Sequence, residues 1–352
     1  MRRVPARPGM STPRASTVRR VPRRAIWGGL ATACVLLAGC GGRQSTLNPR
    51  SKPAHDITTL WWWMLAVAGV VFLGAVVMLL VAYLRREPGL PFLGEREQLS
   101  TGLVVVFGMA IPIVILVALF IVANLDVLKA TSAPRASSTK LTIKVIGHQW
   151  FWEVRYPGTA AVTANEIHIP TGTRVNVEGT TDDVIHSFWV PELNRKIDLI
   201  PGRVNRVLLY TNRPGVYRGQ CAEFCGDQHA HMSFAVFADP PARFRAWLAN
   251  EAAPAHPQPA GLAQAGERTF MGSQCASCHT IRGTPANGHV GPDLTHFGSR
   301  TALAAEMLLN KPNNVARWVR DPQHFKPGAK MPGLDLTQAQ LGAIVPYLES
   351  LK

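Results

Sequence analysis

Charged residues are scarce in this chain of 352 residues: they make up 17% of it, against 47% hydrophobic residues. This balance excludes an ordinary soluble enzyme, and a polytopic transporter would carry still less charge, so a few membrane spans with soluble domains fit best. The length corresponds to about two domains.

Cysteine is also scarce. Six cysteines are too few for a disulfide scaffold, and four of them form the close pairs Cys221/Cys225 and Cys275/Cys278, which favours metal or cofactor chemistry.

Acidic residues are missing from residues 1–39, which hold eight arginines. Removing these eight from the net charge of +15 leaves +7 spread thinly over the rest, which argues against nucleic-acid binding. The basic leader continues into an apolar stretch, residues 25–38, as in a secretory signal peptide. Its end, Leu37-Ala38-Gly39-Cys40, resembles a bacterial lipobox, which implies cleavage before Cys40 and lipid attachment to its sulfur. A signal anchor with an incidental cysteine is the alternative.

Two long apolar runs, Leu60–Leu84 and Gly102–Leu125, contain no charged residue. Each exceeds the roughly 20 residues that cross a bilayer, and neither has the polar face of a buried core helix, so a two-helix membrane hairpin is predicted. The lysines and arginines around the runs favour neither orientation. An exported N-terminus decides the orientation, because two spans return the chain to the outer side. Everything beyond about residue 130 is therefore expected on the periplasmic side of a bacterial cytoplasmic membrane.

Beyond the hairpin the sequence pattern changes twice. Short period-2 or apolar runs at residues 141–145, 166–169, 174–178, 206–210 and 234–237, separated by Pro-Gly and Thr-Gly turns, predict a β-sandwich or Greek-key barrel over residues 139–240. Residues 251–261, rich in proline and alanine, predict a semi-rigid linker, and residues 262–352 a small all-α domain. The helices expected in that domain are Leu262–Phe270, Thr301–Leu309 and Thr337–Leu351. The predicted division is therefore a leader (1–39), an N-terminal segment with the hairpin (40–130), the sandwich, the linker and the helical domain.

The sandwich region carries a cluster of soft metal donors. The segment Cys221-Ala-Glu223-Phe-Cys225-Gly-Asp-Gln-His229-Ala-His-Met232, with His186 as a distant partner, offers thiolate, imidazole and thioether groups that suit copper. One thiolate would make a mononuclear blue-copper site, whereas two bridging sulfurs can hold two copper ions with one histidine on each. Zinc is the rival, because two cysteines and two histidines satisfy its tetrahedral preference. However, C-x₃-C is an unusual zinc spacing, and zinc has no need of the methionine.

These residues resemble the copper domain of cytochrome c oxidase subunit II, whose motif is C-x-E-x-C-G-x-x-H-x-x-M with an upstream histidine. Residues 147–152 (GHQWFW), 186–191 (HSFWVP) and 198–203 (DLIPGR) match the same family, as does the predicted hairpin. The resemblance covers about residues 55–240 and implies a cupredoxin-like sandwich. It further implies a dinuclear CuA centre whose ligands are His186, Cys221, Cys225, His229, Met232 and the carbonyl of Glu223.

Two further roles follow from the same resemblance. The side chain of Glu223 would reach a magnesium ion at the boundary with subunit I. Trp150 would be the aromatic residue through which electrons enter, although plain sandwich core is the alternative for this tryptophan. In many members of the family a glutamate followed three residues later by a tryptophan begins the second helix, at the mouth of a proton channel. Here Glu95 and Glu97 precede the helix without that tryptophan, so neither is assigned to proton uptake.

The helical region opens with Cys275-Ala-Ser-Cys278-His279. C-x-x-C-H allows two thioether bonds to a haem while the adjacent imidazole binds the iron, with a redox dithiol as the alternative. Residues 291–294 (GPDL) and 328–333 (GAKMPG) resemble the haem-edge and methionine loops of class I cytochromes c, over residues 262–352. The resemblance implies Met331 as the sixth haem ligand. Its rival, Met307, stands in an apolar stretch where core packing is the default.

Taken together, the resemblances imply a subunit II with a fused cytochrome c, from a caa-type haem–copper oxidase. Its expected partners are oxidase subunit I, subunit III, a periplasmic cytochrome c or other electron donor, and membrane lipid; nucleic acid is not among them. A nitrous oxide reductase would need a histidine-rich propeller domain, and a quinol oxidase subunit would lack the copper ligands. A copper carrier would need exposed thiolates and no haem.

Overall fold

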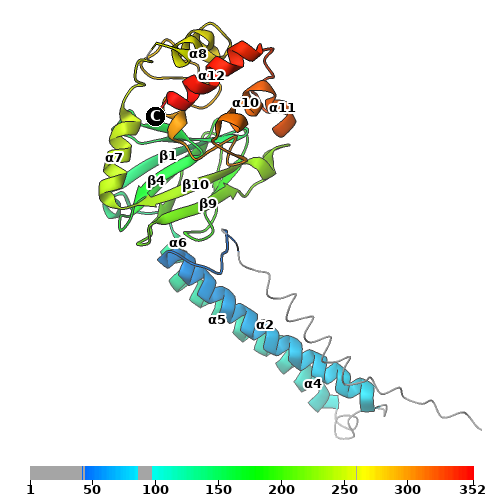
Figure 1. The fold of residues 1–352 in the computed structure, drawn as a ribbon. Coiled ribbons are helices and arrows are strands. Elements are labelled where there is room, and N and C mark those ends of the chain that lie inside the picture. Colours follow the sequence, from blue (N-terminus) through cyan, green and yellow to red (C-terminus); the bar gives the residue numbers. More distant parts are fainter. Residues whose placement is uncertain (1–41, 43, 86–96, 259) are drawn as a thin grey trace, which may run out of the picture. The chain divides into compact units, whose positions relative to one another are not determined.

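The computed structural model describes residue 42 and residues 44–85, 97–258 and 260–352. The predicted signal peptide, Cys40 and Glu95 lie outside the described residues. Three regions follow one another along the chain in Figure 1: apolar helices, a β-sandwich and a helical region at the C-terminus.

Two apolar helical segments form the N-terminal region. Helix α2 (Lys52–Arg85) is followed by α4 (Glu97–Val105), which continues through a π-helical turn (Val106–Ala110) into α5 (Ile111–Val122). A second π-helical turn (Ala123–Leu128) and the short α6 (Lys129–Thr131) end the segment. The parts Lys52–Leu84 and Thr101–Thr131, of 33 and 31 residues, are long and apolar enough to cross a membrane. At about 1.5 Å per residue each exceeds the roughly 30 Å of hydrocarbon.

Proline explains one irregularity of the second segment. Pro112 stands in the first turn of α5, directly after the first π-helical turn. Because proline has no backbone N–H and its ring crowds the preceding turn, a regular α-helical ladder cannot continue through it. The wider turn before it absorbs this defect.

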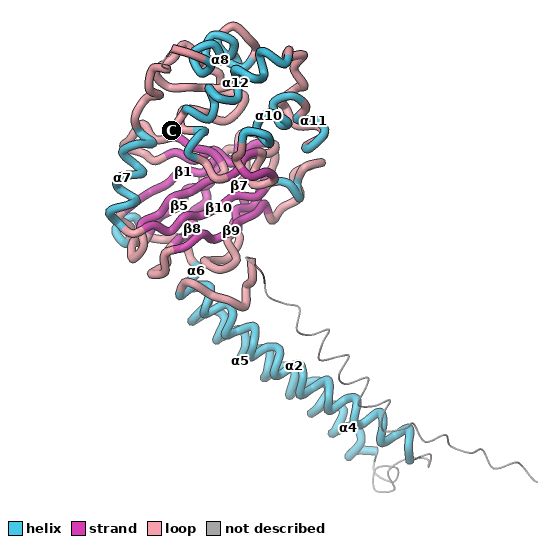
Figure 2. The backbone as a smooth tube through the Cα atoms, viewed as in Figure 1, coloured by secondary structure: helices cyan, strands magenta, loops and turns pink. Residues whose placement is uncertain are grey.

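The predicted β-sandwich is confirmed, and Figure 2 shows its strands gathered in one region of the chain. One sheet has the order β3-β2-β1-β5-β8 and the other β4-β10-β9-β6-β7. The core between them is dominated by fully buried aromatic and branched side chains such as Trp152, Phe188 and Phe234. The strands are β1 (Leu141–His148), β2 (Phe151–Arg155), β3 (Val162–Ala164), β4 (Glu166–Pro170), β5 (Val175–Thr181), β6 (His186–Trp189), β7 (Ile197–Leu199), β8 (Asn205–Leu209), β9 (Gly215–Cys221) and β10 (Ser233–Asp239).

Helix α7 (Pro241–Ala252) follows the last strand and packs on the sandwich, with Phe244 and Trp247 beside the buried Tyr156. The structure therefore differs from the expected linker at its start, because Glu251 and Ala252 are helical and Glu251 is buried. The next residues are also held, since the Ala255 amide donates to the Arg282 carbonyl at 2.8 Å. The chain between the two folded domains is thus partly fixed rather than a free tether.

The C-terminal region is helical, as predicted, with a core of its own. Its helices are α8 (Leu262–Met271), α9 (Cys275–Cys278), α10 (Pro312–Arg320), α11 (Pro322–Phe325) and α12 (Gln338–Ser350), of which α8 and α12 pack together. Short 3₁₀ turns occur at Ala136–Ser138, His229–His231 and Phe297–Ser299.

The helix expected at Thr301–Leu309 is wrong. Residues Ala302–Leu303 (β11) and Leu308–Leu309 (β12) pair instead as a small antiparallel hairpin. Three successive residues between them, Ala304, Ala305 and Glu306, have φ values of 54–68°, in the left-handed region that a right-handed helix cannot contain. The apolar residues whose spacing resembled that of a helix lie in two paired strands.

Candidate functional site: a sulfur and histidine cluster beside a cytochrome cavity

The copper-type donors come from three parts of the sandwich. His186 begins β6, and Cys221 ends β9. The loop after β9 supplies Cys225, the 3₁₀ turn supplies His229, and Met232 stands directly before β10. Antiparallel pairing of β6 with β9, through Phe188 and Cys221, brings the distant histidine to the cysteine loop. The sheet thus joins ligands 35 residues apart in sequence.

The donor atoms form a continuous chain of close contacts. The two sulfurs, Cys221 Sγ and Cys225 Sγ, are 3.7 Å apart. Cys221 Sγ lies 3.8 Å from His186 Nδ1 and 3.2 Å from the Glu223 carbonyl oxygen. Cys225 Sγ lies 3.6 Å from His229 Nδ1 and 3.8 Å from Met232 Sδ. Both cysteines are free, since a disulfide needs about 2.05 Å, and the donor set fits a soft metal such as copper.

The electrostatics of the two thiols are coupled. A hydrogen bond from the Cys225 thiol lowers the pKa of Cys221 despite burial, and hydrogen bonds with His186 and with the Ser187 backbone lower it further. The same pairing raises the pKa of Cys225, and burial raises it further. The pairing therefore favours one thiolate beside one thiol, and a bound cation would favour the charged form of both.

Asp183 orients the first histidine and was not identified from the sequence. Its Oδ1 lies 2.9 Å from His186 Nε2, and Oδ2 accepts from the Gln149 amide at 2.7 Å. Burial alone would raise the pKa of Asp183, but hydrogen bonds from His186 and from the amides of Gln149 and Val184 hold it well below its usual range. The carboxylate therefore fixes the Nε2–H tautomer and leaves Nδ1 free to bind a metal, as carboxylates beside metal-binding histidines do.

Trp150 lies directly beside this cluster. Its indole Nε1 donates to the Cys225 carbonyl at 2.9 Å, and Gln149 Nε2 donates to the same oxygen at 2.8 Å. Only 9% of Trp150 is exposed. Glycine is required nearby, because a Cβ at Gly147 would fall 2.7 Å from His186 Cδ2.

The remaining residues near the motif have more ordinary surroundings. The carboxylate of Glu223 is half-exposed and lies 3.8 Å from Lys196 Nζ. His231 is exposed, and its Nδ1 lies 2.7 Å from Gln228 Oε1, which separates it from the donor cluster. Phe224 is the most exposed aromatic residue of the loop.

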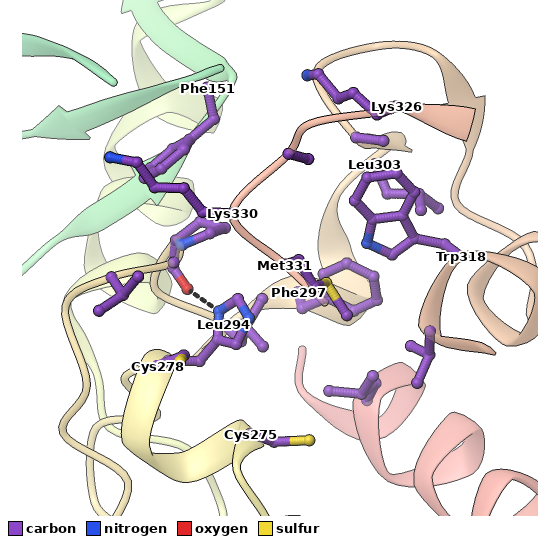
Figure 3. A pocket seen from close by; sticks show the side chains of 18 of the residues that line it. Phe151, Cys275, Cys278, Leu294, Phe297, Leu303, Trp318, Lys326, Lys330 and Met331 are labelled. Atoms are coloured by element: carbon purple, nitrogen blue, oxygen red, sulfur yellow. Dashed lines mark hydrogen bonds between the residues drawn. The ribbon is translucent and has the colours of Figure 1, made fainter. Parts of the chain in front are cut away.

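A large cavity lies in the C-terminal region, with about 1350 Å³ of empty space counted out to its open mouth. Cys275, Cys278, His279 and Met331 all line it, and Figure 3 shows Met331 beside Phe297 and Trp318, with the two cysteines on α9. Met307 is not among the lining residues. The sandwich closes part of the wall through Gln149, Trp150, Phe151 and Asn165.

His279 has one ring nitrogen held by the backbone and the other free. Its Nδ1 lies 2.8 Å from the Pro292 carbonyl oxygen, so Nδ1 carries the proton and Nε2 keeps its lone pair. Burial lowers the pKa of His279, which keeps the ring neutral. A Cβ at Gly291 would fall 2.4 Å from His279 Cε1, so glycine is required beside the ring. The two free thiols, the neutral imidazole and the apolar cavity fit a covalently attached haem.

Two family models match this chain, one after the other. The family model "Cytochrome C oxidase subunit II, periplasmic domain" matches residues 160–238, and the model "Cytochrome c" matches residues 263–352. Cytochrome c oxidase subunit 2 of Alkalihalophilus pseudofirmus is 33% identical over 337 residues, which cover 92% of this chain and 96% of the relative. The same protein of Bacillus subtilis is 30% identical, with 92% and 96% covered.

Among solved structures, the periplasmic domain of subunit II of the cytochrome oxidase of Bradyrhizobium japonicum is 32% identical, with a TM-score of 0.32. It matches 34% of this chain and 96% of that chain. The two relatives match 92% of this chain, and the two family models match it in succession. The chain belongs to the cytochrome c oxidase subunit 2 family and carries a fused cytochrome c domain.

Proposed function

We propose that this chain passes electrons from a periplasmic donor through a covalently bound haem c to a dinuclear CuA centre. From there they continue to the haem of subunit I, where oxygen is reduced to water with coupled proton translocation. The observation that carries the proposal is that two separate donor sets, one for copper and one for haem, lie in contacting domains of one chain. When bound, the copper pair and the haem each accept and release single electrons. The residues described below hold these groups and exclude water.

The dinuclear assignment rests on the pairing of donors. Each thiolate has its own histidine, His186 beside Cys221 and His229 beside Cys225. Each also has one weaker donor, the Glu223 carbonyl for Cys221 and Met232 Sδ for Cys225. Two metal ions sharing the sulfurs would use this whole set, whereas a single zinc ion would leave the methionine and the carbonyl unused.

The haem assignment uses Cys275 and Cys278 for the two thioether bonds and His279 and Met331 as axial ligands. Trp150 is then the residue through which electrons enter the copper domain, because its indole N–H donates a hydrogen bond to the Cys225 carbonyl. Little of its ring is open to a diffusing donor, so the haem domain is the source of these electrons.

Several further assignments complete the proposal. The half-exposed Glu223 carboxylate would reach a magnesium ion at the boundary with subunit I. Residues 1–39 form the lipoprotein signal peptide, Cys40 carries the lipid, and the two apolar helices anchor the chain in a bacterial cytoplasmic membrane with both redox domains in the periplasm. Loss of residues 1–39 and a lipid-sized mass increment on Cys40, seen by intact-mass analysis, test the leader.

The decisive experiment is purification of the complex from native membranes with metal and haem analysis. Copper, covalent haem and a co-purifying many-span partner are expected. A variant with Cys275→Ser and Cys278→Ser should lose the haem, keep its copper and oxidise the physiological donor much more slowly. If the haem-free variant oxidised the donor at the wild-type rate at every ionic strength, electrons would enter at the copper directly, and the proposed route would be wrong.

A further inference from the structure

The loop that carries Met331 is held by the copper domain. Its first residue, Lys326, donates from Nζ to the Trp150 carbonyl at 2.7 Å. The next residue, Pro327, accepts at its carbonyl a hydrogen bond from Gln228 Nε2, at 2.8 Å. A weaker contact follows where Lys330 Nζ lies 3.6 Å from Asp183 Oδ2. Residues 326–330 thus meet the copper domain beside both Trp150 and the residue that orients His186.

Lys326 is unusual among these contacts because it is only 3% exposed. Within the described part of the chain, no carboxylate lies within ion-pair distance of its ammonium group. Burial lowers the pKa of Lys326 to about 7. Lysine is almost never buried without a partner, and the Trp150 carbonyl is the partner that accepts from Lys326 Nζ. An exposed lysine suits transient docking, whereas this one belongs to an interface that stays formed.

The loop behaves as one unit from Lys326 to Met331. Gln323 on α11 donates from Nε2 to the carbonyls of Ala329 and Met331, at 2.8 and 2.7 Å. Its Oε1 accepts from the Gly328 amide at 2.9 Å. The Ala329 amide donates to the Lys326 carbonyl at 3.0 Å, so a displacement at Lys326 reaches the tied segment and Met331. Figure 3 shows Lys326, Lys330 and Met331 on the segments around the cavity.

We propose that Lys326 is a positioning residue: by anchoring the methionine loop to the Trp150 carbonyl, it makes the copper domain hold the sixth haem ligand in place. The inference rests on the proposed haem binding by Cys275, Cys278, His279 and Met331. Its consequence is that the iron–methionine bond and electron transfer between the two domains depend on the same hydrogen bond.

A second set of contacts, away from the loop, keeps the domains together without Lys326. Glu166 Oε1 on β4 accepts from the Thr301 amide at 2.7 Å and from its hydroxyl at 2.6 Å. Arg282 donates from Nη2 to the Glu251 carbonyl at 2.6 Å and from Nη1 to the Ala160 carbonyl. Removing the lysine should therefore release the methionine loop rather than detach the whole domain.

The test compares Lys326→Met with Lys330→Met in the full-length, membrane-assembled protein. Methionine keeps the length of the stem and removes the ammonium group. Lys330 is the matched control, because it lies in the same loop but is half-exposed and makes only the long contact. Two quantities are measured: the absorption band of methionine-ligated ferric haem, and the rate of electron equilibration between haem and copper after rapid photoreduction.

For Lys326→Met we expect the ratio of methionine-bound to methionine-free haem, and the rate of equilibration, to fall by about tenfold, the effect of losing one charge-assisted hydrogen bond. For Lys330→Met we expect changes within about twofold, as for exposed ion pairs. A Lys326→Met protein that kept its haem and copper and matched the wild type in both quantities would overturn the inference.

Hydrogen exchange of the wild-type chain gives an independent readout, should the variant fail to fold. The hydrogen-bonded amides of Lys326, Gly328 and Ala329 should exchange as slowly as those of the neighbouring helix α10. Exchange at the rate of an exposed loop would overturn the inference, because the loop would not be anchored. Wild-type protein without covalent haem would instead defeat the proposed function, so the two failures are distinguishable.

Discussion

Replacing Asp183 by asparagine tests how the copper cluster is oriented. The carboxylate accepts from His186 Nε2 at 2.9 Å, from the Gln149 amide at 2.7 Å and from the Val184 amide at 2.8 Å. Asparagine keeps the shape but offers one acceptor and a competing NH₂ donor, so it no longer enforces the Nε2–H tautomer. Loss of such an outer partner costs about 10–100-fold in metal affinity, or about 1.4–2.7 kcal/mol.

The assay is competition for copper between the purified chain and a chelator, followed by the absorption of the copper–thiolate centre. Asp182→Asn is the matched control, because Asp182 is adjacent and exposed and removes the same charge. We expect Asp183→Asn to lose copper at a roughly 10–100-fold lower chelator concentration than either the wild type or the control. Equal copper retention in the two variants would refute the role given to Asp183.

Three further predictions concern the thiolates, the haem and pH. Cys225→Ser puts a harder donor in place of one bridging sulfur, so electron paramagnetic resonance should change from a delocalised copper pair to an isolated copper, or copper should be lost; an unchanged spectrum would exclude the bridge. Gly291→Ala would push a methyl group against the His279 ring and should sharply lower covalent haem content, whereas Gly342→Ala, with open space around it, should not; haem assays decide between them. Burial raises the pKa of Glu251 to about 7, so the folded state binds more protons than the unfolded state between about pH 4.5 and 7, and stability should fall by up to about 3 kcal/mol as pH rises through that window. Glu251→Gln should remove this loss, making the variant more stable than the wild type at pH 8 and similar to it at pH 4.5; identical pH slopes in urea unfolding would contradict the assignment.

Local sequence determined the strands and helices whose patterns are regular. The alternating run that begins at Leu141 became β1, and the apolar stretch that begins at Leu262 became α8. The membrane segments also followed from composition, because a long run without charge has few alternatives to crossing lipid. Strands β6 and β9 were not predicted, because their sequences carry ligands and aromatic residues in place of a regular alternation of apolar and polar residues.

The error at Thr301–Leu309 has a related cause. Apolar spacing there fits a helix, yet Ala302 and Leu303 face the cavity, and the chain must reverse at once to pair Ala302 with Leu309. Residues in the left-handed region make that reversal possible, and alanine carries no sequence signal for it. Hydrogen bonds next to the hairpin also stabilise it, because Asn310 Nδ2 donates to the carbonyls of Phe297 and Arg300.

By itself, the sequence determined which chemistry the chain can perform. Spacing put Cys221, Cys225, His229 and Met232 in one short segment, and C-x-x-C-H put both thiols near an imidazole, since few residues separate these ligands. Only the tertiary structure decided what surrounds them: Asp183 behind His186, and the methionine loop against the copper domain through Lys326. These contacts join residues of different elements, the second of them 176 positions apart, and depend on strand pairing and on how two domains pack. Local patterns do not encode that packing.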